Sequence, residues 1–379
     1  SMRDRARSVL ARLGEPIDPD ARLGDLSIGK RQMVEIGKAL LRDARIIAFD
    51  EPTSSLSSRE TDALLAVIRD LKNEGRAILY VSHRMEEVFR LCDSLTVLRD
   101  GRLAGDHARL SDVTEDALIR EMAGRRIEDV YGYTSRPLGE PVVQVEGLTG
   151  KGLSAPVSFT AHRGEILGFF GLIGAGRTDL LKLLFGAVPR TGGRIAIRGQ
   201  TCNFDHPRQA IAGGLALLPE DRKDEGIVPL ASVRENIALA WRNLSRRSPV
   251  LAAANEAEAA RDHIASLRIK TASPEIAVAT LSGGNQQKAI LARWLSADAD
   301  IFLMDEPTRG IDIGARSEIY ALMHRLAQAG KTLIVVSSDL PEVMGVSDRI
   351  VVMREGAVAG LFDRAEATPE ILHRHALPD

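Results

Sequence analysis

The chain has few cysteines, no long apolar run and no excess of either charge. Only Cys92 and Cys202 are present, too few and too far apart for a thiolate metal site or a disulfide framework, which favours a reducing compartment. No apolar run approaches the roughly 18 residues of a membrane span, so we expect any action at a membrane to need a partner. Lys and Arg number 50 against 52 Asp and Glu, with signs mixed throughout. This balance excludes the basic stripe of a sequence-independent nucleic-acid binder.

One stretch of the chain occurs twice at a constant offset. The matching blocks are Leu26–Gln32 with Leu281–Gln287, Asp50–Thr53 with Asp305–Thr308, and Val81-Ser82 with Val336-Ser337. The register holds without a gap as far as Gly105 and Gly360, which indicates a tandem duplication. A glycine loop precedes only the second copy. At the same spacing, the loop of the first copy would lie before residue 1, so we expect the chain to begin within its first domain.

The alternation of strand-like and helix-like segments predicts an α/β fold in both copies. Apolar runs of strand length at 46–49 and 77–81 flank a segment of helical period at 61–71, which is typical of a mostly parallel sheet. We predict the C-terminal part of a first domain at 1–124, a linker at 125–141 and a complete second domain at 142–379. Short strands at 142–145, 157–160 and 195–197 and a helix-rich region at 233–295 are expected in that second domain.

A glycine loop stands between a predicted strand at 165–170 and a predicted helix at 179–185. Its candidate phosphate-binding residues are Gly171, Gly174, Ala175, Gly176, Arg177 and Thr178. Backbone N–H groups of such a loop converge on phosphate oxygens, and the Thr178 hydroxyl stands where Mg²⁺ binds. Arg177 replaces the lysine of the GxxxxGK[ST] pattern. A dinucleotide turn fails because Asp179 occupies its third glycine position, whereas a plain strand–helix turn stays open at this point.

Paired acids end one predicted strand in each copy, Asp50-Glu51 and Asp305-Glu306. An aspartate at a strand's carboxyl end can hold Mg²⁺, and the adjacent glutamate can polarise water for attack on a γ-phosphate. A polar strand end is the structural alternative. Two such pairs at equal distance from matching upstream blocks favour the functional interpretation.

The upstream blocks place serine and glycines at a predicted helix start. These residues are Ser27 and Gly29 in the first copy and Ser282, Gly283 and Gly284 in the second. They offer backbone donors and a hydroxyl for anion capture, although a serine helix cap alone is common. The order of glycine loop, LSGGNQQ and DEPT within one domain is far more specific.

These motifs together resemble the ATP-binding-cassette (ABC) ATPases, and most of all the fused two-cassette subunits of bacterial monosaccharide importers. The resemblance is carried by GAGRT at 174–178, PEDRK at 219–223, LSGGNQQK at 281–288 and DEPTRGID at 305–312. Within this family, residues 49–57 and 80–87 resemble most the members that import L-arabinose. The resemblance implies a P-loop NTPase fold with a mixed sheet, an antiparallel β subdomain and a helical subdomain, in tandem, with the first copy incomplete.

The resemblance also implies that two cassettes pack head to tail. ATP and Mg²⁺ would lie between the glycine loop of one cassette and the signature of the other, which is the block at 26–32 in the first copy and at 281–287 in the second. The loop at 171–178 would then share its nucleotide with Ser27 and Gly29. Ser282, Gly283 and Gly284 would face the other nucleotide, where Asp50 supports the metal, Glu51 is the general base and His83 senses the γ-phosphate.

The resemblance predicts unequal sites. At the loop site Arg177 replaces lysine, Ile28 replaces a signature glycine, Ser338 stands where the first copy has His83, and Glu220 occupies the usual glutamine position. We therefore expect this site mainly to bind ATP, with Glu306 in the base position and Asp305 supporting the metal.

The partners that the resemblance implies are the permease subunits of a sugar importer, at the cytoplasmic face of the inner membrane, and indirectly a periplasmic sugar-binding protein. Residues 219–229 resemble the permease-contacting region, where Arg222 and Lys223 would either serve that contact or be solvated charges. A soluble duplicated cassette acting on nucleic acid or the ribosome is disfavoured by two cysteines and a short linker of mixed charge. A nucleotide-binding fragment without hydrolysis is the remaining alternative.

Overall fold

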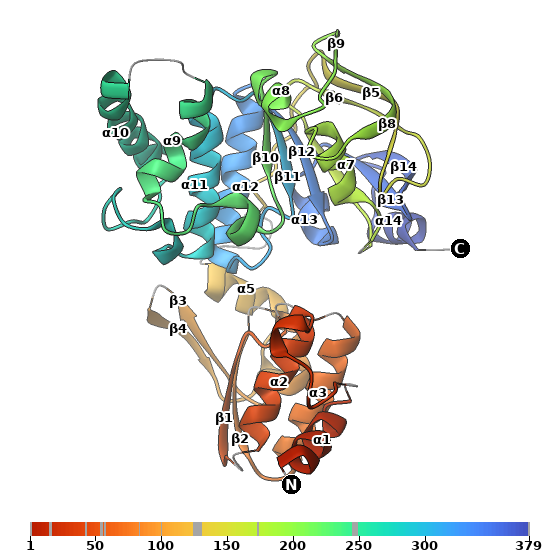
Figure 1. Ribbon diagram of the computed structural model, residues 1–379. Helices are drawn as coiled ribbons and strands as arrows, with labels where there is room; N and C mark the ends of the chain where they lie inside the picture. The colour runs from red at the N-terminus through yellow and green to blue at the C-terminus, as the bar shows by residue number, and fades with distance from the viewer. Residues whose placement is uncertain are drawn as a thin grey trace. The chain divides into compact units, whose positions relative to one another are not determined.

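The computed structural model describes residues 2–14, 17–41, 44–53, 56, 58–82, 84–99, 101–123, 131–172, 174–244 and 249–377 (Figure 1). The chain divides into two compact units, residues 1–124 and 125–379, here called the first and the second unit. Each unit is described by itself.

The second unit is built on a six-stranded sheet in the order β10-β11-β12-β7-β13-β14. Its strands are β7 (Ile166–Phe170), β10 (Leu215–Leu218), β11 (Ile301–Asp305), β12 (Thr332–Ser337), β13 (Arg349–Arg354) and β14 (Ala357–Asp363). All neighbouring pairs are parallel except the β13–β14 hairpin, so the predicted mixed sheet is confirmed. Every residue of β7, β11 and β12 is buried, which explains their continuous apolar sequences.

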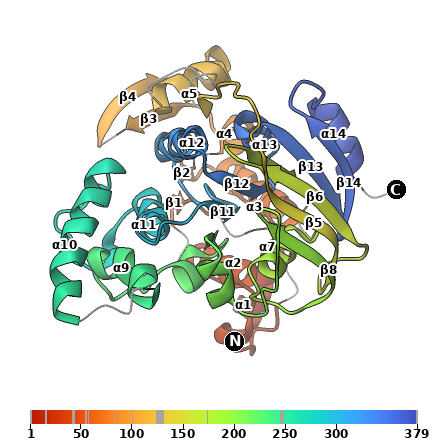
Figure 2. The same cartoon turned by 90° about the horizontal axis from the view of Figure 1, so that it is seen from above.

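Two further layers flank this sheet on opposite sides (Figures 1 and 2). On one side lies an antiparallel sheet of β5 (Pro141–Gly150), β6 (Val157–His162), β8 (Arg190–Ile197) and β9 (Gln200–Cys202). On the other lie helices α9 (Val233–Leu244), α10 (Pro249–Ser266) and α11 (Gly283–Ser296). The other α-helices among the described residues of the unit are α7 (Arg177–Leu184), α8 (Pro207–Ala212), α12 (Ile313–Gln328), α13 (Leu340–Val346) and α14 (Pro369–Ala376). Both predicted subdomains are therefore present.

The first unit repeats part of this architecture. Its elements are α1 (Met2–Arg12), α2 (Ile28–Leu40), β1 (Ile46–Asp50), α3 (Ser58–Asn73), β2 (Ala77–Val81), α4 (Met85–Leu91), β3 (Leu95–Arg99), β4 (Arg102–His107) and α5 (Glu115–Ala123). Strands β1 and β2 are parallel, and β3 and β4 form an antiparallel hairpin. Helices α1, α2 and α3 cover one face of β1–β2 in Figure 1, and Leu64 and Ile68 of α3 are fully buried.

The second unit has a strand, β7, between two strands whose counterparts in the first unit are not joined within the described ranges. In the second unit β7 pairs with both β12 and β13, whose counterparts are β2 and β3. Among the described residues of the first unit, no strand joins β2 to β3. Leu79 and Leu98 are consequently 61% and 72% exposed, whereas the matching Ile334 and Met353 are fully buried.

Residues 131–140 of the predicted linker belong to the second unit. The Tyr131 ring packs directly on the backbone of Gly345 in α13, because a Cβ on Gly345 would lie 2.2 Å from Tyr131 Cδ1. The Arg136 guanidinium donates two hydrogen bonds, of 3.0 and 2.9 Å, to Asp348 Oδ2. The Tyr133 hydroxyl donates to the other Asp348 oxygen at 3.2 Å. These contacts fix the segment against the unit.

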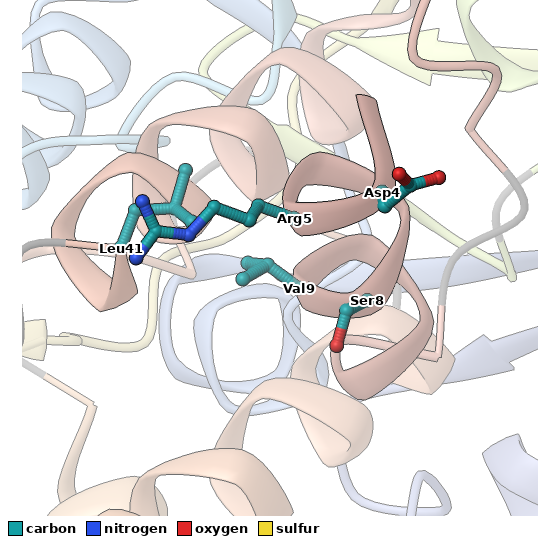
Figure 3. A pocket seen from close by; sticks show the side chains of 5 residues that line it. All are labelled: Asp4, Arg5, Ser8, Val9 and Leu41. Carbon is teal, nitrogen blue, oxygen red and sulfur yellow. The ribbon is translucent and has the colours of Figure 1, made fainter. Parts of the chain in front are cut away.

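A hollow of about 380 Å³ lies beside α1 in the first unit, lined by Asp4, Arg5, Ser8, Val9 and Leu41 (Figure 3). Leu41 follows the C-terminal end of α2, whereas the signature residues Ser27 and Gly29 lie at its N-terminal end. A helix of 13 residues separates the two ends by roughly 20 Å. The hollow is therefore separate from the signature.

Candidate functional site

The glycine loop joins β7 to α7 with a backbone that requires glycine. Gly174 and Gly176 have φ of +85° and +86°, a left-handed conformation that side chains disfavour. A Cβ on Gly176 would also lie 2.6 Å from the Gly152 carbonyl oxygen. The loop therefore presents its backbone at the start of α7, where N–H groups and the helix dipole favour an anion. Ile173, inside the loop, is outside the described residues.

Thr178 and Asp305 meet below this loop. Asp305, the last residue of β11, is 2% exposed, and the Thr178 hydroxyl lies within hydrogen-bonding reach of its carboxylate. Burial raises the pKa of Asp305 to about 6, and Thr178 partly opposes that shift. Asp305 Oδ1 is buried without a hydrogen-bond partner. A hydroxyl beside a buried, unpaired carboxylate oxygen fits Mg²⁺, which proteins hold with one or two such groups plus substrate phosphates.

Arg177 is buried at the head of α7 and pairs with the acid after β11. Its Nη2 lies 3.4 Å from Glu306 Oε1, and its Nη1 is buried without a partner. Burial lowers the pKa of Arg177, and Glu306 and Asp305 partly oppose this. A guanidinium keeps its charge in such a site, so the unused Nη1 donors remain available to a phosphate.

Glu306 has a strained backbone and an engaged side chain. Its φ is +46°, and its N–H donates to the Val336 carbonyl at 2.8 Å. The carboxylate accepts from the Ser338 N–H at 2.8 Å and from the Ser337 hydroxyl at 3.3 Å. Ser338 occupies the position that corresponds to His83 in the first copy. Its backbone N–H, not its side chain, thus binds the Glu306 carboxylate.

Glu220 and Arg222 are tied to the loop that follows β11. Glu220 is exposed and forms an ion pair with Arg309. Arg222 donates from Nη1 to the Arg309 carbonyl at 2.6 Å and from Nη2 to the Gly310 carbonyl at 2.9 Å. Arg222 is therefore a structural tie, whereas Lys223 is exposed.

The second-copy signature begins α11, with Ser282 as its N-cap. The Ser282 hydroxyl accepts from Asn285 Nδ2 at 2.8 Å. A Cβ on Gly284 would lie 2.6 Å from Ala315 Cβ, and one on Gly283 would lie 2.6 Å from Arg222 Nη2. Both glycines therefore permit close packing as well as exposing their N–H groups.

The first-copy residues lie in the first unit. Ser27 caps α2, its hydroxyl accepting from the Lys30 N–H at 3.4 Å, and Gly29 is buried against Glu60. Asp50 is exposed at the end of β1, and Glu51 repeats the left-handed backbone of Glu306 with φ of +44°. His83 is outside the described residues.

A second acid, which the sequence analysis missed, supports each acidic strand end. In the second unit Glu342 accepts from Thr308 at 2.6 Å and contacts the Ser337 hydroxyl. In the first unit Glu87 accepts from Thr53 at 2.9 Å and from Ser82 at 3.2 Å. The only sequence signal for this pair was the repeat itself, because both acids occur at the common offset.

Comparison with known proteins agrees with this geometry. A family model described as ABC transporter matches residues 1–54 and 155–309. A nucleotide-free ATP-binding cassette from an ABC transporter aligns with a TM-score of 0.54 and 18% identity, covering 63% of this chain and all of that one. A dimeric bacterial ABC transporter cassette aligns with a TM-score of 0.51 and 22% identity, covering 59% of this chain and 98% of that one. The chain belongs to the ABC transporter family and has the ABC ATPase fold.

Relatives with higher sequence identity to this chain are arabinose import ATP-binding proteins. An arabinose import ATP-binding protein of Burkholderia cenocepacia is 57% identical over 375 residues, which are 99% of this chain and 73% of that protein. The arabinose import ATP-binding protein of Azospirillum brasilense is also 57% identical, over 72% of its length. That of Chromohalobacter salexigens is 51% identical over 76% of its length.

Proposed function

We propose that the chain is the ATP-binding subunit of an importer for arabinose or a related pentose, acting with permease subunits at the cytoplasmic face of the inner membrane. The observation that carries this is the glycine loop with Thr178 and the buried Asp305 beneath it, in a chain similar along 99% of its length to arabinose import proteins. A periplasmic sugar-binding protein would deliver sugar to the permease. Within the described ranges, no helix is long and apolar enough to cross a membrane.

The site at Gly171–Thr178 binds ATP and hydrolyses it slowly in this proposal. Thr178 and Asp305 would hold Mg²⁺, which neutralises phosphate charge when bound. Glu306 is a poor base as it stands, because its two oxygens already accept from Ser338 N and Ser337 Oγ and the Arg177 cation lies 3.4 Å away. These contacts also favour the second candidate function, nucleotide binding without hydrolysis.

In this proposal, ATP is hydrolysed mainly at a second nucleotide site, which contains Glu51. Ser282, Gly283 and Gly284 would face a second nucleotide, with Asp50 supporting its metal and Glu51 acting as base. Ser27 and Gly29 would complete the site at Gly171–Thr178. Contact of the Pro219–Pro229 segment with the permease belongs to the same proposal, supported by the exposure of Val228 within it (47%) and of Leu230 directly after it (93%).

Two matched substitutions test the division of labour. Glu306→Gln is expected to lower MgATP turnover by the purified chain only slightly, whereas Glu51→Gln lowers it strongly. Binding of a fluorescent ATP analogue should survive both changes and weaken in Arg177→Ala, since Arg177 supplies the buried cation of the loop. Loss of turnover in Glu306→Gln with full turnover in Glu51→Gln would reverse the assignment.

A transport assay tests the substrate class. Cells that lack their own arabinose importer ATPase should regain uptake of labelled arabinose when they express the chain with the cognate permease. Restored uptake of a hexose, with none of arabinose, would refute the pentose assignment while leaving ATP binding intact.

A further inference from the structure

Glu342 is a fully buried acid two hydrogen bonds away from the loop site. It lies in α13, is 1% exposed, and accepts from the Thr308 hydroxyl at 2.6 Å through Oε1. Its Oε2 contacts the Ser337 hydroxyl. Within the part of the chain that the structure describes, no cation pairs with this carboxylate.

The Ser337 hydroxyl stands between two carboxylates and has one proton. Its oxygen accepts from the Asp339 N–H at 3.1 Å. It lies 3.3 Å from Glu306 Oε2 and also contacts Glu342 Oε2. A hydroxyl can donate to only one acceptor at full strength. If both acids are ionised, one of them loses this donor. If Glu342 carries a proton, it donates to Ser337 and the Ser337 proton goes to Glu306.

In the first copy, Glu87, which corresponds to Glu342, accepts hydrogen bonds from more donors. Glu87 accepts from the Tyr80 hydroxyl at 2.8 Å and from Arg84 Nη1 at 3.2 Å, besides Thr53 and Ser82. At the common offset these two donors become Val335 and Asp339 in the second copy. The second copy has thus exchanged a phenol and a guanidinium for an apolar side chain and another acid, which removes support for an ionised Glu342.

The surroundings of Glu342 favour its neutral form. Burial raises the pKa of Glu342 to about 7, Asp339 and Glu306 add repulsion, and the bonds from Ser337 and Thr308 oppose the shift. The charged and titratable groups around it are Asp339 on its own helix, Glu306 after β11, Tyr320 of α12 through Thr308 at 3.4 Å, and Arg316 through Asp339 at 3.5 Å.

We propose that Glu342 is a positioning residue that holds a proton and thereby directs the Ser337 hydroxyl to Glu306. The Glu342 O–H donates to Ser337 Oγ, and Ser337 O–H donates to Glu306 Oε2. When Glu342 releases its proton to solvent, the Ser337 O–H turns to Glu342 and Glu306 loses one donor. Glu306 Oε2 then accepts one hydrogen bond fewer. The inference deepens the proposed function, since it takes Glu306 as the acid beside the phosphates.

Infrared difference spectroscopy of the nucleotide-free chain tests the proton directly. Because burial also raises the pKa of Asp305 to about 6, the test uses an Asp305→Asn background, which should show a protonated-carboxyl band from Glu342 that titrates near neutrality. The ratio of protonated to ionised Glu342 should fall from about 10:1 one pH unit below the midpoint to about 1:10 one unit above it. Glu342→Gln, whose amide can still donate to Ser337 and accept from Thr308, should lack the band. Glu87→Gln is the matched control and should keep it.

A second readout separates positioning from folding. In a Glu51→Gln background, where only the slow loop site cleaves ATP, the rate of single-turnover ATP cleavage should change across the same pH range and stay flat once Glu342→Gln is added, with unchanged tryptophan fluorescence. Absence of the band in the Asp305→Asn chain, or its persistence when Glu342→Gln is added to that chain, would overturn the proposal. Failure of the proposed function would instead abolish nucleotide binding and leave the nucleotide-free spectrum as expected.

Discussion

Replacement of Arg136 by alanine should lower the free energy of unfolding of the second unit, although the sequence predicts that this residue lies in a linker. Arg136 is 10% exposed and Asp348 5%, so their ion pair is buried. Arg136 also contacts His324 Nδ1 at 3.2 Å. Removing one partner of a buried pair costs about 3–5 kcal/mol, because the other charge stays buried and uncompensated.

The expected cost lies at the lower end of this range. Asp348 keeps the Ile166 N–H at 2.8 Å and the Tyr133 hydroxyl at 3.2 Å as donors after Arg136→Ala. Burial already raises the pKa of Asp348, so protonation of the carboxyl limits the penalty further. We expect the free energy of unfolding to fall by about 3 kcal/mol. Arg136→Lys should lose less, since it keeps the charge but cannot form the paired N–H donors.

Urea unfolding followed by tryptophan fluorescence reads out this unit alone. The chain has 2 tryptophans, Trp241 and Trp294, and both belong to the second unit. Arg325→Ala is the matched control, because Arg325 is an exposed arginine of the same unit and its loss should cost less than about 0.5 kcal/mol. An Arg136→Ala midpoint equal to that of the control would refute the claim that this segment is part of the folded unit.

Three other predictions concern the site and the buried imidazole. Gly176→Ala should weaken binding of a fluorescent ATP analogue at least about tenfold, because its Cβ would meet the Gly152 oxygen at 2.6 Å. Gly199→Ala, with a similar positive φ but open space around it, should bind normally. Asp305→Asn should abolish the gain in ATP affinity that Mg²⁺ gives over EDTA; an undiminished gain would place the metal elsewhere. Burial, and then Arg136, lower the pKa of His324 to about 4, so unfolded chains take up a proton first as pH falls from about 6.5 to about 4 and stability is lost there. His324→Gln should remove up to about 3 kcal/mol of that loss in urea titrations, and an unchanged pH dependence would exclude His324 as its source.

Local patterns in the sequence predicted the elements that carry the site. The alternation of apolar and helical segments located β1 and β2, and the paired acids marked the end of β11, because a buried parallel strand needs a continuous apolar run. The glycines of the loop predicted a backbone that can converge on phosphate, and the structure has positive φ at Gly174 and Gly176. The repeat assigned matching roles to Glu51 and Glu306, whose backbones share one conformation.

Contacts between distant positions could not be predicted in this way. Arg136 and Asp348 are 212 residues apart, and nothing in a charged, proline-bearing segment indicates which buried acid it will meet. Arg222 donates to backbone carbonyls, which every residue possesses, so its sequence gives no sign of its partners. Glu342 looks like an ordinary acid in the first turn of a helix, and only the tertiary fold buries it.

The strained acids themselves argue that both copies retain a use for the carboxylate. A left-handed backbone at a residue with a side chain costs roughly 1–2 kcal/mol, and glycine avoids that cost. Glu51 and Glu306 nevertheless both adopt it, each with its N–H bonded to the neighbouring strand, at Val81 and Val336. A turn without a chemical role would be more stable with glycine at this position. The difference in hydrolysis that we propose between the copies would therefore arise from the groups around each glutamate, such as Arg177 beside Glu306, rather than from loss of the acid itself.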